Sequence, residues 1–379
     1  MPSSLMLLTY PFRPDPRVLR EARSLSKHGL KVKLIAWDRD GDLPKVANEH
    51  GIEVIRLGPR SPYRSVGKIL WRLPRFWLRA LCASRKMEFE LVHCHDFDTL
   101  PIGLAIGRLR GTPVLFDAHE IYSAMIRKDI GGFSRIVWRL ERMMSRCADD
   151  IITVNDALAK SLSTEGKPLP KIVMNSPDTS VLEGANAADI RSRYNLKGFV
   201  LSYLGSLEPG RFVQEMIGSV EPSGKVTLAI GGDGTMKPVA EKASLENPSI
   251  KFLSTLDTDE ALRVTCASDL VMVMLDPTNP NYKISTPVKV LDAMACGRPV
   301  VISEGLDMAN KVKEIGCGFV IPYDKEAFKA TISKAMISPE MLREMGRKGK
   351  EYFEKELSWE RSEVELLKAY QALLVSRPS

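Results

Sequence analysis

The chain has 379 residues and a formal net charge of +7, with 27% charged and 44% hydrophobic residues. This length exceeds what one hydrophobic core ordinarily organises, so we expect two domains. The composition is that of a soluble globular protein, and no apolar run reaches the roughly 18 residues that a membrane-spanning helix needs.

The cysteines and the start of the chain indicate a cytosolic protein. The six cysteines are scattered without close spacing, which favours a reducing compartment over a disulfide framework or a zinc knuckle. The opening MPSSLMLLTYPF lacks the basic segment of a signal peptide, and we expect it to form a first strand.

The first half of the chain repeats a strand–helix pattern. A helix is expected to open at Asp15-Pro16, with Val18, Ala22 and Leu25 on its apolar face. Short apolar runs predict strands at Ser4–Thr9, Lys31–Trp37, Ile52–Leu57, Glu90–His95, Pro113–Phe116, Asp150–Thr153 and Lys171–Met174.

Two windows of the first half are strongly basic. Residues 60–87 hold eight basic residues and no acidic one, and residues 123–146 hold six basic residues against Asp129 and Glu141. Together the windows carry a net charge of +12, and they contain Trp71, Trp77 and Trp138. Three interpretations are open: ordinary domain helices with solvated charges, a nucleic-acid surface, or contact with an anionic membrane. We favour the membrane.

Two segments at strand ends carry polar side chains. His93-Cys94-His95-Asp96-Phe97-Asp98 could bind a metal ion, but we expect Asp96 and Asp98 to cap the helix Thr99–Leu109 instead. Asp117-Ala118-His119-Glu120-Ile121-Tyr122 follows the next strand. His119 therefore lies just past a carboxyl end, where open α/β sheets place their ligands.

A turn-rich linker, Asn175-Ser176-Pro177-Asp178, predicts the domain boundary, and the strand–helix pattern restarts after it. Strands are expected at Phe199–Tyr203, Val226–Ile230, Ile250–Leu253 and Leu270–Met274. Glycine-rich turns follow the first two strands, over Leu204–Arg211 and Gly231–Gly234. Such turns let a diphosphate approach backbone N–H groups.

The most informative stretch is Asn279–Val301. A polar loop leads to Thr286 as N-cap and Pro287 as first helical residue, and Gly297 ends the helix before a buried strand. Lys289 in the first turn, with the helix N-terminus, makes an anion site, and Asp292 is placed to accept two sugar hydroxyls. The alternative is an ordinary capped surface helix.

Asp117–Tyr122 and Pro287–Val301 resemble the corresponding segments of glycosyltransferase family 4, whose members are retaining, metal-independent enzymes of the GT-B fold. The resemblance extends over nearly the whole chain. It implies an α/β fold of two doubly wound, Rossmann-like domains facing a cleft. Residues 1–175 would form the acceptor domain and residues 176–357 the nucleotide-sugar donor domain, with residues 358–379 crossing back to the first.

The resemblance also implies roles for individual residues. His119, Arg211 and Lys289 would be catalytic, and Asp15, Arg17 and Glu120 would lie on the acceptor side, although Asp15 alternatively caps its helix. No metal or other cofactor is expected, and the donor would be a UDP- or GDP-linked sugar. The implied donor-binding residues are Gly205, Ser206, Gly232, Asp233, Thr286, Pro287, Val288 and Asp292.

The sequence departs from the family pattern at three places. The Gly-Gly of the first loop is absent, Ser206 stands where the family usually has an arginine, and Ile284 stands at the first position of its Glu-x7-Glu pair. Donor binding is therefore expected to depend more heavily on Arg211 and Lys289, and the sequence does not indicate which sugar is carried.

The expected function is sugar transfer to a lipid-linked or cell-surface glycan precursor, such as a polyprenyl-diphosphate sugar. The enzyme would work at the inner face of the membrane without a nucleic-acid partner, and its oligomeric state is not indicated. Two alternatives are a nucleotide-sugar epimerase of similar fold and a catalytically inactive protein that binds a nucleotide sugar.

Overall fold

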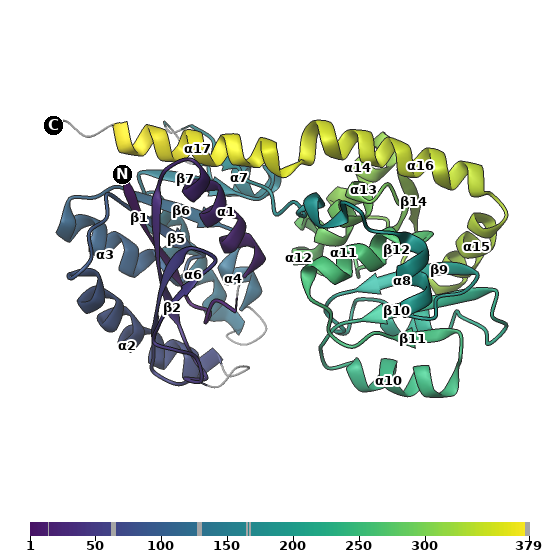
Figure 1. Cartoon of the computed structure of the whole chain (residues 1–379). Helices are drawn as coiled ribbons and strands as arrows, with labels where there is room; N and C mark the ends of the chain where they lie inside the picture. The colour runs from purple at the N-terminus through teal and green to yellow at the C-terminus, as the bar shows by residue number, and fades with distance from the viewer. Residues whose placement is uncertain (14, 62–65, 127–130, 164–165, 167, 376–379) are drawn as a thin grey trace. The chain divides into compact units, whose positions relative to one another are not determined.

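The computed structural model describes residues 1–13, 15–61, 66–126, 131–163, 166 and 168–375, and the chain divides into two compact units (Figure 1). Unit 1 comprises Met1–Met174 and Glu360–Ser379, and unit 2 comprises Asn175–Trp359. Arg64, Arg127, Lys128 and Asp129 of the basic windows lie outside the described residues.

Unit 1 is built on an eight-stranded sheet in the order β3-β4-β2-β1-β5-β6-β7-β8. Every neighbouring pair is parallel except β3 and β4, which are antiparallel. The strands are β1 (Ser3–Leu8), β2 (Lys31–Trp37), β3 (Val46–Glu49), β4 (Ile52–Leu57), β5 (Leu91–His95), β6 (Val114–Ala118), β7 (Asp150–Thr153) and β8 (Lys171–Ile172). The edge strand β3 is not predicted from the sequence, because its residues, VANE, form no apolar run.

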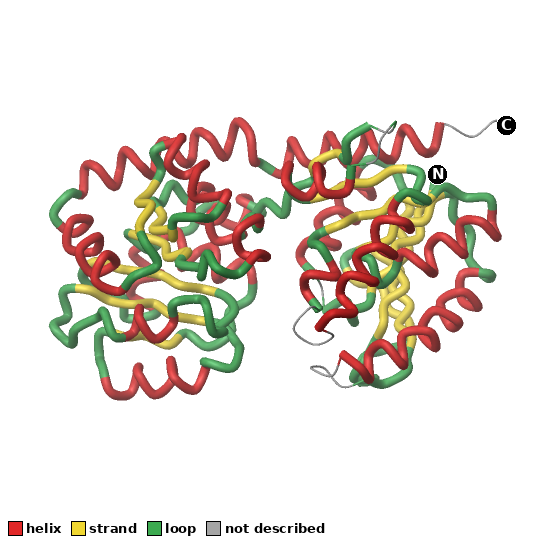
Figure 2. The backbone as a smooth tube through the Cα atoms, turned by 180° about the vertical axis from the view of Figure 1, so that it is seen from behind, coloured by secondary structure: helices red, strands yellow, loops and turns green. Residues whose placement is uncertain are grey.

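Helices flank the strands of each unit (Figure 2). Nearly all of the last helix belongs to unit 1, where it buries Leu366, Ala369, Tyr370 and Leu373. The helices of unit 1 are α1 (Pro16–Lys27), α2 (Val66–Ser84), α3 (Leu100–Arg110), α4 (Tyr122–Met125), η1 (Gly131–Phe133), α6 (Ser134–Ser145), α7 (Asp156–Leu162) and α17 (Trp359–Val375).

Helix α2, from the first basic window, contributes largely to the core. Leu73 and Phe76 are buried, and the Phe76 ring stacks on Trp37 with their centroids 5.3 Å apart. The indole Nε1 of Trp77 donates to the Asp98 carbonyl at 2.8 Å. For these aromatic side chains, the domain-helix interpretation is therefore the correct one.

Unit 2 contains a six-stranded, all-parallel sheet in the order β11-β10-β9-β12-β13-β14. Chain order reverses between β9 and β12, which is where doubly wound sheets bind ligands. The strands are β9 (Phe199–Leu204), β10 (Val226–Gly231), β11 (Ile250–Phe252), β12 (Leu270–Val273), β13 (Val300–Ser303) and β14 (Gly318–Ile321). The two doubly wound sheets confirm the predicted α/β class.

The helices of unit 2 include a short one that the sequence analysis had assigned to a loop. Asn279 caps α12 by accepting from the Asn281 amide, because its side chain competes well for the first free N–H groups. The helical elements are η2 (Thr179–Leu182), α8 (Ala187–Arg193), α9 (Val213–Ile217), α10 (Lys237–Glu246), α11 (Thr258–Cys266), α12 (Pro280–Ile284), α13 (Val288–Ala295), α14 (Asp307–Ile315), α15 (Lys325–Met336), α16 (Pro339–Tyr352) and η3 (Phe353–Leu357).

Two predicted helix caps are wrong. Asp96 and Asp98 do not cap α3, whose N-cap is Thr99, because the carboxylate of Asp98 accepts from the Thr9 hydroxyl at 2.7 Å instead. Thr286 does not cap α13, since the extended residue before that helix is Pro287.

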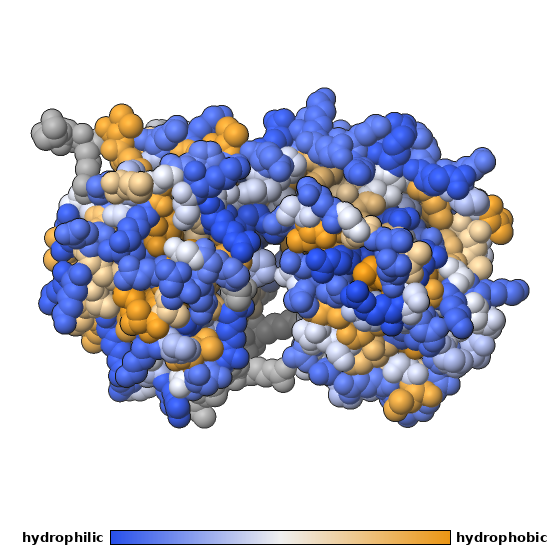
Figure 3. Space-filling view, viewed as in Figure 1, coloured by the Kyte–Doolittle hydropathy of each residue, from blue (hydrophilic) through white to orange (hydrophobic). Residues whose placement is uncertain are grey.

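The surface shown in Figure 3 is mostly hydrophilic on both units, with small apolar patches between the charged side chains. All six cysteines are free thiols. Within the described ranges, every helix is too short or too polar to cross a membrane.

Candidate functional site

Two glycine turns of unit 2 touch at the carboxyl ends of β9 and β10. The Gly205 amide donates to the Gly231 carbonyl at 2.9 Å. Gly232 has a φ of 140°, and a Cβ there would lie 1.8 Å from the Gly205 carbonyl oxygen. Glycine is therefore required at position 232 for the two turns to meet.

Lys289 lies over the first of these turns. A Cβ on Gly205 would stand 2.7 Å from Lys289 Nζ, so the missing side chain makes room for the ammonium group. Lys289 Nζ is also 4.8 Å from the centroid of the Tyr203 ring. Burial lowers the pKa of Lys289 to about 8, the Arg211 charge adds to this effect, and Asp292 opposes it.

Arg211 approaches the same place from the loop after β9. Its guanidinium carbon is 5.2 Å from the centroid of the Tyr282 ring, on α12. Its buried Nε has no hydrogen-bond partner among the described residues. The structure thus gathers two cations and two aromatic rings beside the glycine turns.

The N-terminus of α13 completes this arrangement. Lys289 is the second residue of the helix. The N-cap residue is Pro287, whose side chain makes no capping hydrogen bond. The first backbone N–H groups of a helix attract anions, and the helix dipole adds to that attraction. A diphosphate would satisfy the N–H groups, Lys289 and Arg211 together. We call Gly205, Arg211, Lys289 and the α13 N-terminus the anion site.

The other predicted donor residues lie around the anion site in several settings. Ser206 is exposed, and its carbonyl accepts from the Tyr203 hydroxyl at 2.6 Å. Asp233 is exposed, with its carbonyl accepting from Leu207 N at 2.8 Å. Three more of these residues lie around the start of α13. Thr286 and Asp292 are partly buried, and Val288 is 45% exposed.

In unit 1, His119 forms an ion pair at the carboxyl end of β6. Its Nε2 lies 2.7 Å from Asp117 Oδ2, and its backbone N–H donates to Asp96 Oδ1 at 3.3 Å. Burial acts to lower the pKa of His119, but the Asp117 carboxylate outweighs it and the net shift is upward. The pair with Asp117 therefore favours the protonated form of His119.

The same Asp117 oxygen anchors a second imidazole. His95 Nδ1 is 3.0 Å from Asp117 Oδ2. Burial would raise the pKa of Asp117, yet the interactions with His119 and His95 hold it well below the usual range. Asp117 thus stays ionised in a buried position because two neighbouring rings donate to it.

Next to this pair lie two side chains, Glu21 and His93, whose neutral forms are favoured by burial. Burial, and next the Asp117 charge, raises the pKa of Glu21 well above its usual value. Burial also lowers the pKa of His93, whose Nδ1 lies 2.9 Å from the Tyr370 hydroxyl of α17. The cluster thereby links the last helix to β5 and β6.

This cluster is also the group whose donor atoms could hold a metal ion. Among the described residues, Glu21, His93, His95 and Asp117 bring one ligand atom each to within 4.8 Å of one another. Neither Asp96 nor Asp98 belongs to this group. Asp117 Oδ2 already accepts from His95 and pairs with His119, so proton sharing accounts for the contacts that the structure contains.

The predicted acceptor-side residues are related to His119 in two ways. Glu120 follows it in the sequence, and Asp15 and Arg17 interact with it through their charges. Asp15 Oδ1 accepts from the Arg17 amide at 3.0 Å and so caps α1, as one of the two interpretations predicted. Its other oxygen pairs with the Arg17 guanidinium at 3.0 Å. Burial raises the pKa of Glu120, and the Asp96 charge adds to the shift.

Sequence reasoning missed four participants, namely Glu21, Tyr203, Tyr282 and Tyr370. One signal was available. Glu21 stands within the apolar positions Val18, Ala22 and Leu25 of α1, where an acid is costly unless it has a partner. The three tyrosines carry no such signal, because their partners lie far away in the chain.

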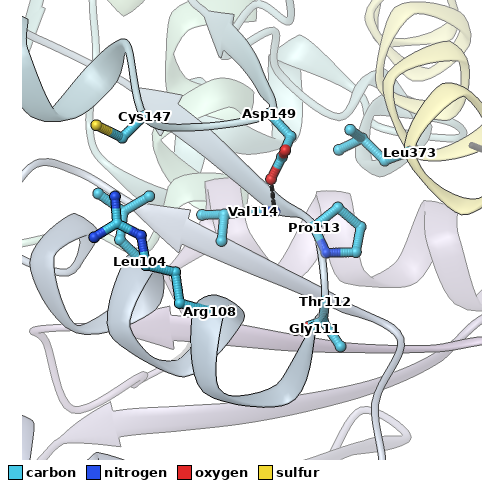
Figure 4. Close-up of a pocket in the computed structure, with 10 residues that line it drawn as sticks. Leu104, Arg108, Gly111, Thr112, Pro113, Val114, Cys147, Asp149 and Leu373 are labelled. Atoms are coloured by element: carbon cyan, nitrogen blue, oxygen red, sulfur yellow. Dashed lines mark hydrogen bonds between the residues drawn. The ribbon is translucent and has the colours of Figure 1, made fainter. Parts of the chain in front are cut away.

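A pocket of about 570 Å³ in unit 1 lies at the end of the sheet opposite His119 (Figure 4). It is lined by Arg108 and Cys147, and by Pro113 and Val114 where β6 begins. Asp149 accepts from the Val114 amide there at 2.7 Å. His119 follows the opposite end of β6, so this pocket is separate from the candidate site.

Comparisons with known proteins agree with the geometry. Residues 14–178 match the family described as "Glycosyl transferase 4-like domain", and residues 198–337 match "Glycosyl transferases group 1". The D-inositol 3-phosphate glycosyltransferase of Rhodococcus erythropolis is 23% identical over 398 residues, which cover 95% of this chain and 86% of that protein. Its counterpart in Salinispora tropica is 22% identical, with 93% and 79% covered.

Solved structures show the same fold. Sucrose-phosphate synthase from Thermosynechococcus elongatus superposes with a TM-score of 0.79 at 18% identity, covering 99% of this chain and 100% of that one. HepE of Anabaena, in complex with UDP and glucose, superposes with a TM-score of 0.73 at 17% identity, covering 98% and 100%.

The anion site predicts that Lys289→Gln and Arg211→Gln each weaken the binding of a nucleoside diphosphate. Each change removes a charge-assisted contact worth roughly 1.5–3 kcal/mol, so the affinity should fall at least about tenfold. Calorimetric titration measures this. Lys242→Gln, which changes an exposed lysine of α10, is the matched control. Wild-type affinity in all three variants would show that the phosphate site is wrong.

Binding should also weaken at alkaline pH. Lys289 loses its proton above about pH 8 in the free protein, whereas a bound diphosphate favours the ammonium form. Affinity is therefore full below pH 8 and falls by up to about tenfold per pH unit above it. Lys289→Arg stays charged and should show a flat profile from pH 7.5 to 9.5. A flat profile in the wild type would contradict this.

His119 should be essential for turnover. His119→Gln keeps an N–H donor toward Asp117, so the melting temperature should change little while turnover drops strongly. In Asp117→Asn, the pKa of His119 should fall, because the carboxylate that raises it is gone. An NMR titration of the histidine ring nitrogens measures this shift, and an unchanged His119 pKa would disprove the role of Asp117.

Proposed function

The chain belongs to the family 4 glycosyltransferases of the GT-B fold, and on that premise we propose that it transfers a sugar from a UDP- or GDP-linked donor to a lipid-linked or cell-surface glycan precursor, with retention and without a metal ion. The observation that carries the proposal is the convergence of Lys289 and Arg211 on the Gly205 turn. Because HepE was solved in complex with UDP and glucose, a UDP-linked sugar is the first donor to test.

Unit 2 supplies the leaving-group chemistry. When the bond to the transferred sugar breaks, negative charge develops on the departing diphosphate. Lys289, Arg211 and the N–H groups of α13 are assigned to that charge, and because they lie close together in the free protein, little reorganisation would be needed as the charge grows. Asp292, one turn after Lys289, is assigned to hydroxyl groups of the nucleotide sugar.

Unit 1 supplies the acceptor side. His119, held by its pair with Asp117, is assigned to a hydroxyl group of the transferred sugar, which it would position by a hydrogen bond. Asp15, Arg17 and Glu120 are assigned to the acceptor. The ion pair between the partly buried Asp15 and Arg17 fixes the orientation of these two side chains. An acceptor hydroxyl then attacks on the face from which the diphosphate leaves and passes its proton to the departing diphosphate, which preserves the anomeric configuration.

The proposed place of action is the inner face of the membrane, where a polyprenyl-linked acceptor is within reach. The basic windows of unit 1 support this, because cationic side chains near anionic lipid contribute roughly 1 kcal/mol each. No nucleic-acid partner and no permanent cofactor is required by this assignment.

A transfer assay tests the proposal. Nucleoside diphosphate release from UDP- and GDP-sugars is measured with and without a polyprenyl-diphosphate sugar in micelles. Release should depend on the acceptor, and NMR of the product should show the donor's anomeric configuration. Interconversion of the donor sugar without release would indicate an epimerase, and donor binding without release would indicate an inactive protein; either result refutes the proposal.

Chelation should leave the transfer rate unchanged. Lys289, Arg211 and the helix N-terminus provide the positive charge that a divalent ion supplies in metal-dependent enzymes. Activity is compared before and after treatment with EDTA. Activity that EDTA abolishes and that Zn²⁺, Mn²⁺ or Mg²⁺ restores would overturn this expectation and direct attention to Glu21, His93, His95 and Asp117.

A further inference from the structure

The helix α6 exposes only arginine and large apolar side chains. All of its residues are described, and the exposed ones are Arg135, Ile136, Arg139, Leu140 and Met143. An ordinary solvent-facing helix of this chain looks different. On α16, Arg347 pairs with Glu344 at 2.7 Å and with Glu351 at 2.5 Å.

The apolar side chains form one row along the helix. Ile136, Leu140 and Met143 are 53%, 43% and 55% exposed, and Phe133 just before the helix is 71% exposed. Their spacing of three, four and three residues places them on one face. These groups are unfavourable in water, so the row indicates a surface that is covered when the protein works.

The arginines form a second row beside the first. Arg135, Arg139, Arg142 and Arg146 follow one another at steps of four, three and four residues. The Arg142 guanidinium lies over the Trp138 ring, 5.8 Å from its centroid. A row of arginines alongside an apolar row is typical of a helix that lies in the interface of an anionic bilayer.

The only acidic residue of α6 faces inward and joins the helix to the candidate site. The buried Glu141 accepts from the Tyr122 amide at 2.9 Å through Oε1 and from the Ser123 amide at 3.2 Å through Oε2. Tyr122 and Ser123 begin α4, three residues after His119. The Glu141 carboxylate thus fixes α6 to the segment that carries His119.

A pocket of about 810 Å³ lies between these elements. Ile121, Ser123 and Ala124 line it from the His119 side, and Arg135 and Trp138 line it from α6. Its described lining combines apolar surface with the guanidinium of Arg135, which suits a group that is part hydrocarbon and part anion.

We propose that α6 docks unit 1 on an anionic lipid bilayer, with Ile136, Leu140 and Met143 in the acyl boundary, the arginine row against lipid phosphates, and the adjoining pocket taking the anionic end of a lipid acceptor. The docking surface stands on the exposed rows alone, whereas the role of the pocket rests on the proposed function. The surface is α6 rather than α2, because α2 exposes only Trp71 and Leu78 among its large apolar side chains whose exposure the structure describes.

Vesicle co-sedimentation tests the docking. The full chain is mixed with vesicles of phosphatidylcholine alone or with phosphatidylglycerol, at low and high salt. Binding should require phosphatidylglycerol and weaken with salt. Each arginine changes partition by about fivefold, so Arg135→Gln/Arg139→Gln should reduce it at least tenfold. Ile136→Ser/Leu140→Ser/Met143→Ser should reduce it by a similar factor.

Matched controls lie on unit 2. Leu245 and Ile337 are 88% and 82% exposed, so Leu245→Ser/Ile337→Ser removes apolar groups that are more exposed than those of α6. Lys242→Gln/Arg343→Gln removes two exposed charges. Both controls should bind as wild type does. Wild-type binding by the α6 variants, or a loss confined to Trp71→Ser/Leu78→Ser, overturns the proposal.

Two further readouts keep the conclusions separate. The melting temperature and the nucleoside diphosphate affinity of the α6 variants should match the wild type, since α6 and the anion site lie in different units. A wild type that binds vesicles but no nucleotide would refute the proposed function and leave the docking surface standing. Transfer to a lipid acceptor that survives in non-binding α6 variants at wild-type rate overturns the role of the pocket.

Discussion

Two like charges converge in unit 2, and the rest of the donor chemistry depends on how they are held there. Lys289 and Arg211 come from a helix start and a glycine turn, and each lies against a tyrosine ring. The depressed pKa of Lys289 records the cost of this arrangement in the free protein. A diphosphate relieves both the repulsion and the desolvation, so the same cost becomes selectivity for a doubly charged ligand.

Unit 1 uses the opposite design. One buried carboxylate, Asp117, contacts two imidazoles, and burial together with the Asp117 charge favours the neutral form of the neighbouring Glu21. The Asp117 charge favours the protonated form of His119 and fixes its ring at the carboxyl end of β6. Because His93 reaches Tyr370 on α17, the last helix takes part in this network rather than merely covering the sheet.

Local patterns predicted the framework well. Apolar runs predicted most of the sheet strands, although not β3 or β14, and glycines between strand and helix predicted the turns at Gly205 and Gly232, because these features follow from backbone constraints on neighbouring residues. A position at a strand end pointed to His119, and a position in the first turn of a helix pointed to Lys289. The roles assigned to them stay predictions.

Contacts between distant segments could not be predicted. Asp98 was expected to cap a helix, but the Thr9 hydroxyl from the neighbouring β1 loop competes for its carboxylate. Tyr203 and Tyr282 meet the cations only after β9 and α12 are folded together, and nothing in either local sequence marks them. The basic windows were read as one surface, whereas packing sends most described aromatics of α2 inward and leaves the rows of α6 outside.

The most direct test of the account is a crystal structure of the protein soaked with UDP- or GDP-linked sugars. The account predicts diphosphate oxygens within hydrogen-bond distance of Lys289 Nζ, the Arg211 guanidinium and the first backbone amides of α13, with the backbone of Gly205 in contact. A diphosphate bound elsewhere, with Lys289 and Arg211 both unengaged, would contradict it.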